Sequence, residues 1–350
     1  MNITAEKKKN FWLNRFVPAI VIVVILALSL VTFAYSFRPN LYSEFSTAGF
    51  WVLRVFSLFL IGAVVAMIFY ELSHAYSEML VPSIILTILY VASMLLGKDF
   101  FSQILFGRLG SSYVPVMNID NIGYLFTEKF EKYIFDYWVL ITTFIVALIF
   151  LLIRLTVVKN ITIKYLIFKT LSLWVISIIL TLFVKTFIVL LTQSYGIELI
   201  LFFIIIASSY DIGGYFGGRF LGHKMFKSKL APTISPKKTW EGAIIGYIVS
   251  FAATMIYIFI AWGIRGKTSD SVAGILLNSS SHFFPYLLSF LFIAPLIALF
   301  GDLFFSLVKR RNEIKDFSNI LKEHGGLLDR IDSISFVFVF FGILAACSTL

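Results

Sequence analysis

Long apolar runs separated by short polar segments dominate the chain. A helix needs about 20 mostly apolar residues to cross the hydrocarbon core of a bilayer. Nine runs come close to that length, at residues 16–37, 49–70, 79–97, 137–153, 170–192, 198–217, 242–264, 284–304 and 333–350. Backbone groups in lipid must be hydrogen-bonded within their own segment, so each run is expected to be helical. The pattern therefore predicts an all-α polytopic membrane protein with about nine transmembrane helices.

The basic residues predict the orientation of these helices. With the N-terminus inside, most of the 29 Lys and Arg residues fall in cytoplasmic segments. We therefore expect a cytoplasmic N-terminus and a C-terminus outside. The first run follows Lys7–Lys9 and Arg15, as a signal peptide would. It is long for such a peptide and no clean cleavage site follows, so a retained first span is expected.

One integrated membrane domain with two regions is expected. Residues 1–200 would form the N-terminal transmembrane helices, with an outer loop at 98–136 that carries short helices on the membrane surface. Residues 201–350 would form the catalytic transmembrane region, because polar residues suited to chemistry gather after residue 207. Lys185 lies inside the fifth run, where it either snorkels to the interface or pairs with a carboxylate.

Composition agrees with a membrane protein. The chain is 59% hydrophobic and only 14% charged, whereas a soluble domain is about a quarter charged. The net charge of +10 would suggest nucleic-acid binding in a soluble protein. Here basic cytoplasmic loops facing anionic lipid headgroups explain it, so membrane lipids are expected as partners and nucleic acid is not. The single cysteine, Cys347, excludes an intrachain disulfide and a Cys-based zinc site, and is expected to be a packing residue.

Three of the carboxylates in or beside the polar segment 305–332, between the last two runs, are candidate metal ligands. Asp302 follows an uncharged run that ends at Gly301, so it is expected at the inner boundary of the membrane. A carboxylate there is costly, and a functional role is the default hypothesis. Asp329 and Asp332 are three residues apart and would share a helix face. Carboxylate oxygens suit Mg²⁺, so this segment is a candidate metal site.

Cations and a glycine pair accompany these carboxylates. The side chains that can neutralise phosphate oxygens are Lys309, Arg310, Lys315 and Arg330. At His324, Gly325 and Gly326, backbone amides can closely approach an anion. The segment is expected to be a cytoplasmic loop at the headgroup layer. For the cations alone, an ordinary basic loop is the alternative.

A second candidate constellation covers residues 207–241. Asp211 interrupts an apolar run and is expected to be buried, facing the bundle interior. Four glycines follow it, and they either allow close helix packing or leave space for a nucleotide: Gly213, Gly214, Gly217 and Gly218. Ser235, Pro236, Lys237, Lys238 and Thr239 are expected to form a turn before a helix. Its two lysines would hold phosphate, unless this too is an ordinary basic loop.

At these residues the chain resembles the CDP-diacylglycerol synthase (phosphatidate cytidylyltransferase) family. The C-terminal signature of that family is matched by Ser306, Val308, Lys309, Arg310, Lys315, Asp316, Ser318, Leu321, His324, Gly325, Gly326, Leu327, Asp329, Arg330, Ile331 and Asp332. Residues 229–242 resemble a second conserved stretch, and the specific likeness covers roughly 207–332. The chain departs from the family pattern at three places. Lys322 replaces a Pro or Gly, Phe305 replaces a Glu found in many members, and residues 212–214 replace the more usual small residues after Asp211.

The resemblance implies a multi-pass protein of the cell membrane that transfers a cytidylyl group from CTP to phosphatidic acid, giving CDP-diacylglycerol and pyrophosphate. It implies Mg²⁺, a second cation such as K⁺, and often a homodimer. Asp302 and Asp329 would hold metal, and the catalytic residues would be Asp302, Ser306, Asp329, Lys309 and Arg310. Substrate would be bound by Asp211, Ser235, Lys237, Lys238, Thr239, Lys315, Asp316, His324, Gly325, Gly326, Arg330 and Asp332. Two alternatives stay open: a CTP-dependent lipid or polyprenol kinase, and a membrane transporter.

Overall fold

The computed structural model describes residues 47–95, 136–157, 162–191, 196–265, 284–320 and 325–347, with isolated residues at 20, 24, 27–32, 134 and 274. Its helices and strands are α3 (Thr47–Ser77), α4 (Leu80–Leu95), α7 (Tyr137–Val157), α8 (Ile163–Leu191), α9 (Gly196–Leu221), β1 (Lys229–Ala231), β2 (Ser235–Thr239), α10 (Trp240–Arg265), α12 (Phe284–Arg311) and α13 (Leu328–Cys347).

Seven described helices are long and apolar enough to cross a membrane: α3, α7, α8, α9, α10, α12 and α13. They correspond to seven of the nine runs and confirm a helical multi-pass membrane protein. The run at 79–97 forms the shorter helix α4, of 16 residues. The first run and the segment 98–136 lie almost wholly outside the described residues, so the helices expected there stay predictions, as does the orientation.

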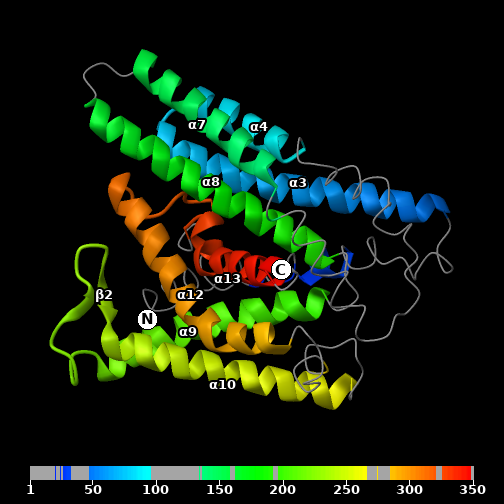
Figure 1. Ribbon diagram of the computed structural model, residues 1–350, viewed down its shortest axis with the longest axis vertical. Helices are drawn as coiled ribbons and strands as arrows, with labels where there is room; N and C mark the ends of the chain where they lie inside the picture. Colours follow the sequence, from blue (N-terminus) through cyan, green and yellow to red (C-terminus); the bar gives the residue numbers. More distant parts are fainter. Residues whose placement is uncertain are drawn as a thin grey trace, which may run out of the picture.

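The helices form two neighbouring groups (Figure 1). Helices α3, α4, α7 and α8 make one group, and α9, α10 and α12 make the other, with α13 packed against both. Aromatic rings fill the space around α13. The ring of Phe203 on α9 lies 4.9 Å from that of Phe338 and 4.7 Å from that of Phe341, both on α13. Large apolar side chains are also exposed along the outer faces of the helices, as lipid contact requires.

Glycines allow α9 and α10 to pack closely. A Cβ atom on Gly213 would lie 2.7 Å from Cβ of Val249, and one on Gly217 would lie 2.6 Å from Cβ of Ile245. From the α10 side, a Cβ on Gly246 would lie 2.9 Å from the backbone oxygen of Tyr210. Small residues bring helix backbones together in this way in membranes. The structure therefore gives Gly213 and Gly217 the packing role, one of the two roles considered from the sequence.

Replacing Gly246 by alanine is expected to destabilise the protein by about 1–3 kcal/mol, because the added methyl would push α9 and α10 apart. Gly263 is a matched control on the same helix, since a Cβ atom there would have nothing within 4 Å. Thermal unfolding in detergent should show a lower midpoint for Gly246→Ala and an unchanged midpoint for Gly263→Ala. Equal midpoints for the two variants would mean that the α9–α10 contact tolerates extra volume.

Two local predictions were wrong. Residues 235–239 form strand β2, antiparallel to β1, instead of a turn. The turn comes earlier, at 232–234, where the fixed φ of Pro232 suits it. Helix α12 also continues to Arg311, so Lys309 and Arg310 are helical, although 305–332 was expected to be a loop. Three cations at its C-terminus favour this extension, because they interact well with the helix dipole.

Candidate active site

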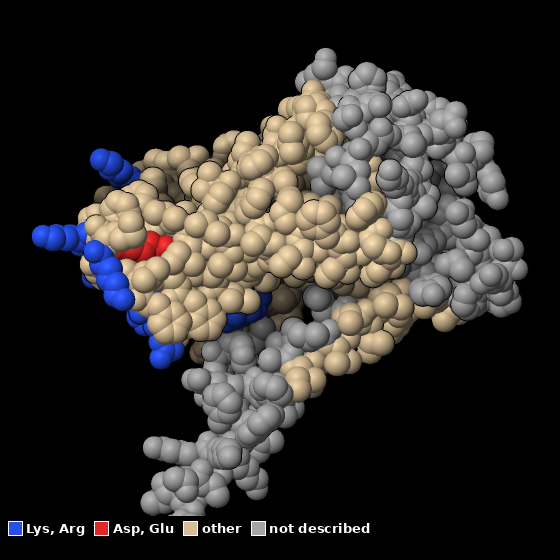
Figure 2. Space-filling view, turned by 90° about the horizontal axis from the view of Figure 1, so that it is seen from below, with Lys and Arg blue, Asp and Glu red and all other residues tan. Residues whose placement is uncertain are grey.

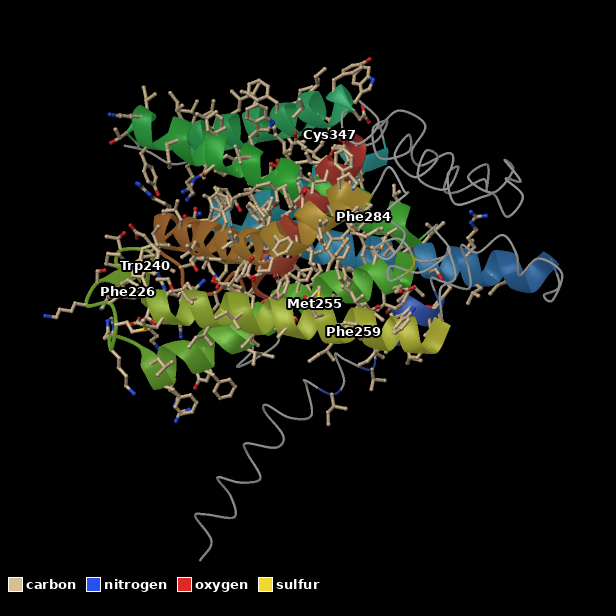
Figure 3. The ribbon with its side chains drawn as sticks, turned by 60° about the horizontal axis from the view of Figure 1, so that its bottom comes forward. Phe226, Trp240, Met255, Phe259, Phe284 and Cys347 are labelled. Carbon is tan, nitrogen blue, oxygen red and sulfur yellow. The ribbon has the colours of Figure 1, made fainter. Side chains whose placement is uncertain are left out.

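Charged side chains gather at one end of the helices. In Figure 2 most Lys and Arg side chains of the visible face lie at this end, with acidic side chains among them, while most of the remaining described surface is uncharged. The hairpin β1–β2 projects there, beside the end of α12 (Figure 1). Phe226 and Trp240 lie at the hairpin end, whereas Phe284 and Cys347 lie toward the other (Figure 3). Cys347 is partly buried, as a packing role predicts.

Asp302 links α12 to the hairpin. One oxygen of its carboxylate pairs with Nζ of Lys238 on β2. The other, Oδ1, accepts a hydrogen bond from Oγ of Ser306, one turn further along α12, at 3.3 Å. The Asp302 side chain is 23% exposed, so a ligand can reach it. The structure thus brings together three residues that were assigned to the site from the sequence.

Asp329 holds the loop between α12 and α13 in place. Its Oδ1 is 3.0 Å from Nζ of Lys309, and its Oδ2 accepts hydrogen bonds from the backbone amides of Phe317 and Gly326, both at 2.9 Å. Nζ of Lys309 is also 3.9 Å from Oδ2 of Asp332, on the same face of α13. Both oxygens of Asp329 therefore have protein donors in this conformation, and its predicted metal role stays a prediction.

Asp211 is exposed, so the expectation that it is buried was wrong. It accepts a hydrogen bond from Oγ of Ser333 on α13 at 3.4 Å. Glycines on α9 fill the contact with α10, whereas Asp211 reaches α13. Its charge interacts with those of Asp302 and Asp332. The chain therefore brings three carboxylates from α9, α12 and α13 near each other at an accessible place.

The donors suit a hard cation such as Mg²⁺. Within the described ranges, no group of three His, Cys, Asp or Glu side chains is arranged to hold a metal ion by itself. Mg²⁺ commonly binds one or two carboxylates and completes its shell with water and substrate phosphate. Asp302, with Ser306 beside it and Asp211 and Asp332 nearby, offers such a partial set of oxygen ligands.

The other predicted residues surround this centre. The exposed ones are Lys237, Arg310, Lys315, Asp316 and Arg330. Arg310 donates from Nε to the backbone oxygen of Ile234, at 3.4 Å, and so touches the hairpin.

The remaining predicted residues are less exposed or lie outside the described part of the chain. Ser235 is partly buried. Thr239 is buried and caps α10, because its hydroxyl oxygen accepts from the amide of Gly242 at 3.1 Å. Gly325 has φ +76°, which favours glycine. His324 and Lys322 lie outside the described residues.

Two carboxylates that the sequence did not bring to notice hold loops near the site. Glu71, near the end of α3, accepts from Oγ of Ser318 and from the backbone amides of Leu327 and Leu328. Glu241, in the first turn of α10, accepts from the amides of Met225 and Phe226, at 2.9 and 2.8 Å. Glu71 is almost completely buried. Its place directly after the apolar run 49–70 was the available signal, because carboxylates at or within a membrane span are costly.

Phe305 has a packing role. It is fully buried, and its ring lies 6.0 Å from that of Phe317 and 6.1 Å from that of Phe336. An ionised glutamate in this position would be surrounded by apolar rings and would cost free energy. The difference from the family pattern at Phe305 therefore agrees with the apolar packing of this chain.

A family model matches most of the chain, and individual relatives match part of it. The model of the cytidylyltransferase family matches residues 10–348. A phosphatidate cytidylyltransferase of Haemophilus influenzae is 37% identical over 148 residues, or 42% of this chain and 45% of the relative. One of Helicobacter pylori is 37% identical over 144 residues, or 41% and 46%. One of Bacillus subtilis is 34% identical over 154 residues, or 44% and 49%.

The aligned part thus spans less than half the length of each of these three relatives. The family match is more extensive, because it includes the N-terminal helices as well as the segments that carry the charged cluster. The chain belongs to the cytidylyltransferase family.

Proposed function

We propose that the chain is a phosphatidate cytidylyltransferase of the cell membrane, which makes CDP-diacylglycerol and pyrophosphate from CTP and phosphatidic acid. The names of its relatives and its family support this proposal. The observation that carries it is the cluster of carboxylates and lysines where the hairpin, α9, α12 and α13 meet. Phosphatidic acid keeps its phosphate at the membrane surface and CTP arrives from water, so a site at the end of the helices can reach both.

The proposed reaction joins two anions. An ionised phosphate oxygen of phosphatidic acid attacks the α-phosphorus of CTP, the bond from that phosphorus to the bridging oxygen breaks, and pyrophosphate leaves with the bonding electrons. The nucleophile is already ionised near neutral pH, so no strong general base is needed. Charge repulsion is the main obstacle, and cations near the transferring group reduce it. Lys238 and Lys309 lie in the cluster, while Lys237, Arg310 and Lys315 are exposed around it.

Mg²⁺, a second cation such as K⁺, and a homodimer belong to the same proposal. Asp302 and Asp329 are the proposed ligands, and a bound cation would supply positive charge against the phosphate oxygens. Of the two carboxylates, Asp302 is the more accessible, because its side chain is 23% exposed and that of Asp329 is 5% exposed.

Incubation of the purified protein in detergent with CTP labelled at the α-phosphate, phosphatidic acid and Mg²⁺ tests the function. We expect the label to appear in a lipid product, with release of unlabelled pyrophosphate. A parallel reaction with CTP labelled at the γ-phosphate should leave the lipid unlabelled. Transfer of the γ-label to lipid, with release of CDP, would instead establish a CTP-dependent kinase and refute the proposal.

A further inference from the structure

A carboxylate from the N-terminal half of the chain holds the loop that joins α12 to α13. Oε1 of Glu71 accepts hydrogen bonds from Oγ of Ser318 at 2.6 Å and from the backbone amide of Leu327 at 3.0 Å. Its Oε2 accepts from the backbone amide of Leu328 at 2.7 Å. Only 1% of Glu71 is exposed. The contact connects residues that are 247 to 257 positions apart in the chain.

Glu71 and Asp329 hold the two arms of this loop together. Residues 317 and 318 form the first arm, and residues 326–328 form the second. Asp329 binds the amides of Phe317 and Gly326, one from each arm. Glu71 also binds both arms, through Ser318 on the first and Leu327 and Leu328 on the second. The two carboxylates thus close the loop from different helices.

Gly326 shows how closely Glu71 approaches the loop. A Cβ atom on Gly326 would lie 2.6 Å from Oε2 of Glu71 and 2.8 Å from Oγ of Ser318. Both distances are too short for a carbon–oxygen contact. Any side chain at this position would force Glu71 or Ser318 to move, so glycine there fits the contact between Glu71 and the loop.

The energetics favour a specific role for Glu71. A carboxylate inside a transmembrane helix costs free energy, whereas an apolar side chain would keep the helix in the membrane. Three short hydrogen bonds offset this cost, and bonds to an ionised acceptor are stronger than neutral ones. All three donors belong to the loop or to the first residue of α13, so the hydrogen bonds stabilise the position of that loop.

We infer that Glu71 is a positioning residue, which orients residues 315–320 and 325–327 of the loop so that their polar groups meet the anionic nucleotide. The inference rests on the proposed function only in naming CTP as that ligand. Lys315, Asp316, Gly325 and Gly326 lie on this loop, and Asp329 follows it. Glu71 is buried and bonded to the loop, so it is proposed to act through the residues that it holds.

Glu71→Gln tests the inference with little change in volume. Glutamine offers one acceptor oxygen and points N–H groups at the remaining donors, so at least one bond to the loop is lost. We expect the KM for CTP to rise about tenfold, with a smaller fall in kcat. Glu71→Asp keeps the charge and should recover part of the effect. A purely structural role would instead lower the amount of folded enzyme and leave KM unchanged.

Ser73→Ala is the matched control. Ser73 is buried on the same helix, and its hydroxyl finds no hydrogen-bond partner among the described residues. Its loss should leave the KM for CTP unchanged. Ser318→Ala removes a single donor to Glu71 and should raise KM by a smaller factor. If the two residues act through their shared bond, Glu71→Gln with Ser318→Ala should show less than the sum of the two free-energy changes.

Hydrogen–deuterium exchange of the loop gives a result that does not depend on catalysis. Peptides covering residues 325–328 should exchange about tenfold faster in Glu71→Gln than in the natural sequence, because the amide of Leu327 or that of Leu328 then faces an N–H group and loses its acceptor. Peptides from α9 and α10 should not change. Unchanged loop exchange, or an unchanged KM in folded Glu71→Gln, would overturn the inference. If the natural protein makes no CDP-diacylglycerol, the proposed function fails, and exchange alone decides whether Glu71 holds the loop.

Discussion

Asp302→Asn is expected to lower the kcat for cytidylyl transfer by on the order of a thousandfold or more, which is about 4 kcal/mol of transition-state stabilisation. The change removes the negative charge that pairs with Lys238 and retains an oxygen that can accept from Ser306. It therefore weakens cation binding at the centre of the cluster while altering its shape little. Initial rates of lipid labelling from CTP, measured at saturating substrate and Mg²⁺, give kcat directly.

Glu313→Gln is the control for Asp302→Asn. Glu313 is an exposed carboxylate that follows α12 at the same end of the molecule, and it lies outside the proposed site. The Glu313→Gln variant should retain the activity of the natural sequence. That result would show that removing a nearby carboxylate does not by itself lower activity. Both variants should elute as folded protein in detergent. Full activity of folded Asp302→Asn would eliminate the proposed role of this carboxylate.

Lys185→Met is expected to lower the free energy of unfolding by about 3–5 kcal/mol, the usual result of removing one partner from a buried ion pair. Nζ of Lys185 lies 3.1 Å from Oδ2 of Asp136, and only 1% of either side chain is exposed. The pair joins α8 to the start of α7, where Asp136 also accepts from the amide of Trp138. Of the two arrangements considered for Lys185 from the sequence, the structure shows pairing.

A double variant isolates the charge from the shape of this pair. Lys185→Met with Asp136→Asn removes both charges and keeps an acceptor for the amide of Trp138, so it should recover most of the lost stability. The start of α7 and the end of α8 lie away from the hairpin (Figure 1), so activity per folded molecule should be unchanged. Thermal unfolding and activity, measured on the same preparations, show whether the unpaired charge causes the loss of stability. A double variant as unstable as Lys185→Met would show that the ion pair is not the cause.

The helices could be predicted because the bilayer imposes both their length and their composition. Seven of the apolar runs became long helices. The hairpin was missed because its strands are short and carry Lys and Pro, which are signals of a turn as much as of an edge strand. The end of α12 was placed too early, because hydropathy marks where the membrane stops and not where the helix stops.

The sequence predicted which residues belong to the candidate site better than it predicted which residues they pair with. Spacing placed Asp329 and Asp332 on one helix face, as the structure confirms through their shared neighbour Lys309. Nothing local indicates that Lys238 pairs with Asp302, since the two come from separate elements. Asp211 is bonded to Ser333 on α13 and is nevertheless exposed, so the expectation of burial was wrong, and the apolar run around it gives no sign of this.

The attachment of Glu71 to the loop has a consequence for how the protein is made. Helix α3 is synthesised long before residues 318–328, yet the loop acquires its three bonds to Glu71 only when both segments are present. In a nascent chain that has inserted only its first helices, Glu71 lacks the three donors of the loop. Co-translational assembly of the loop is therefore completed only when α13 has entered the bilayer beside α3.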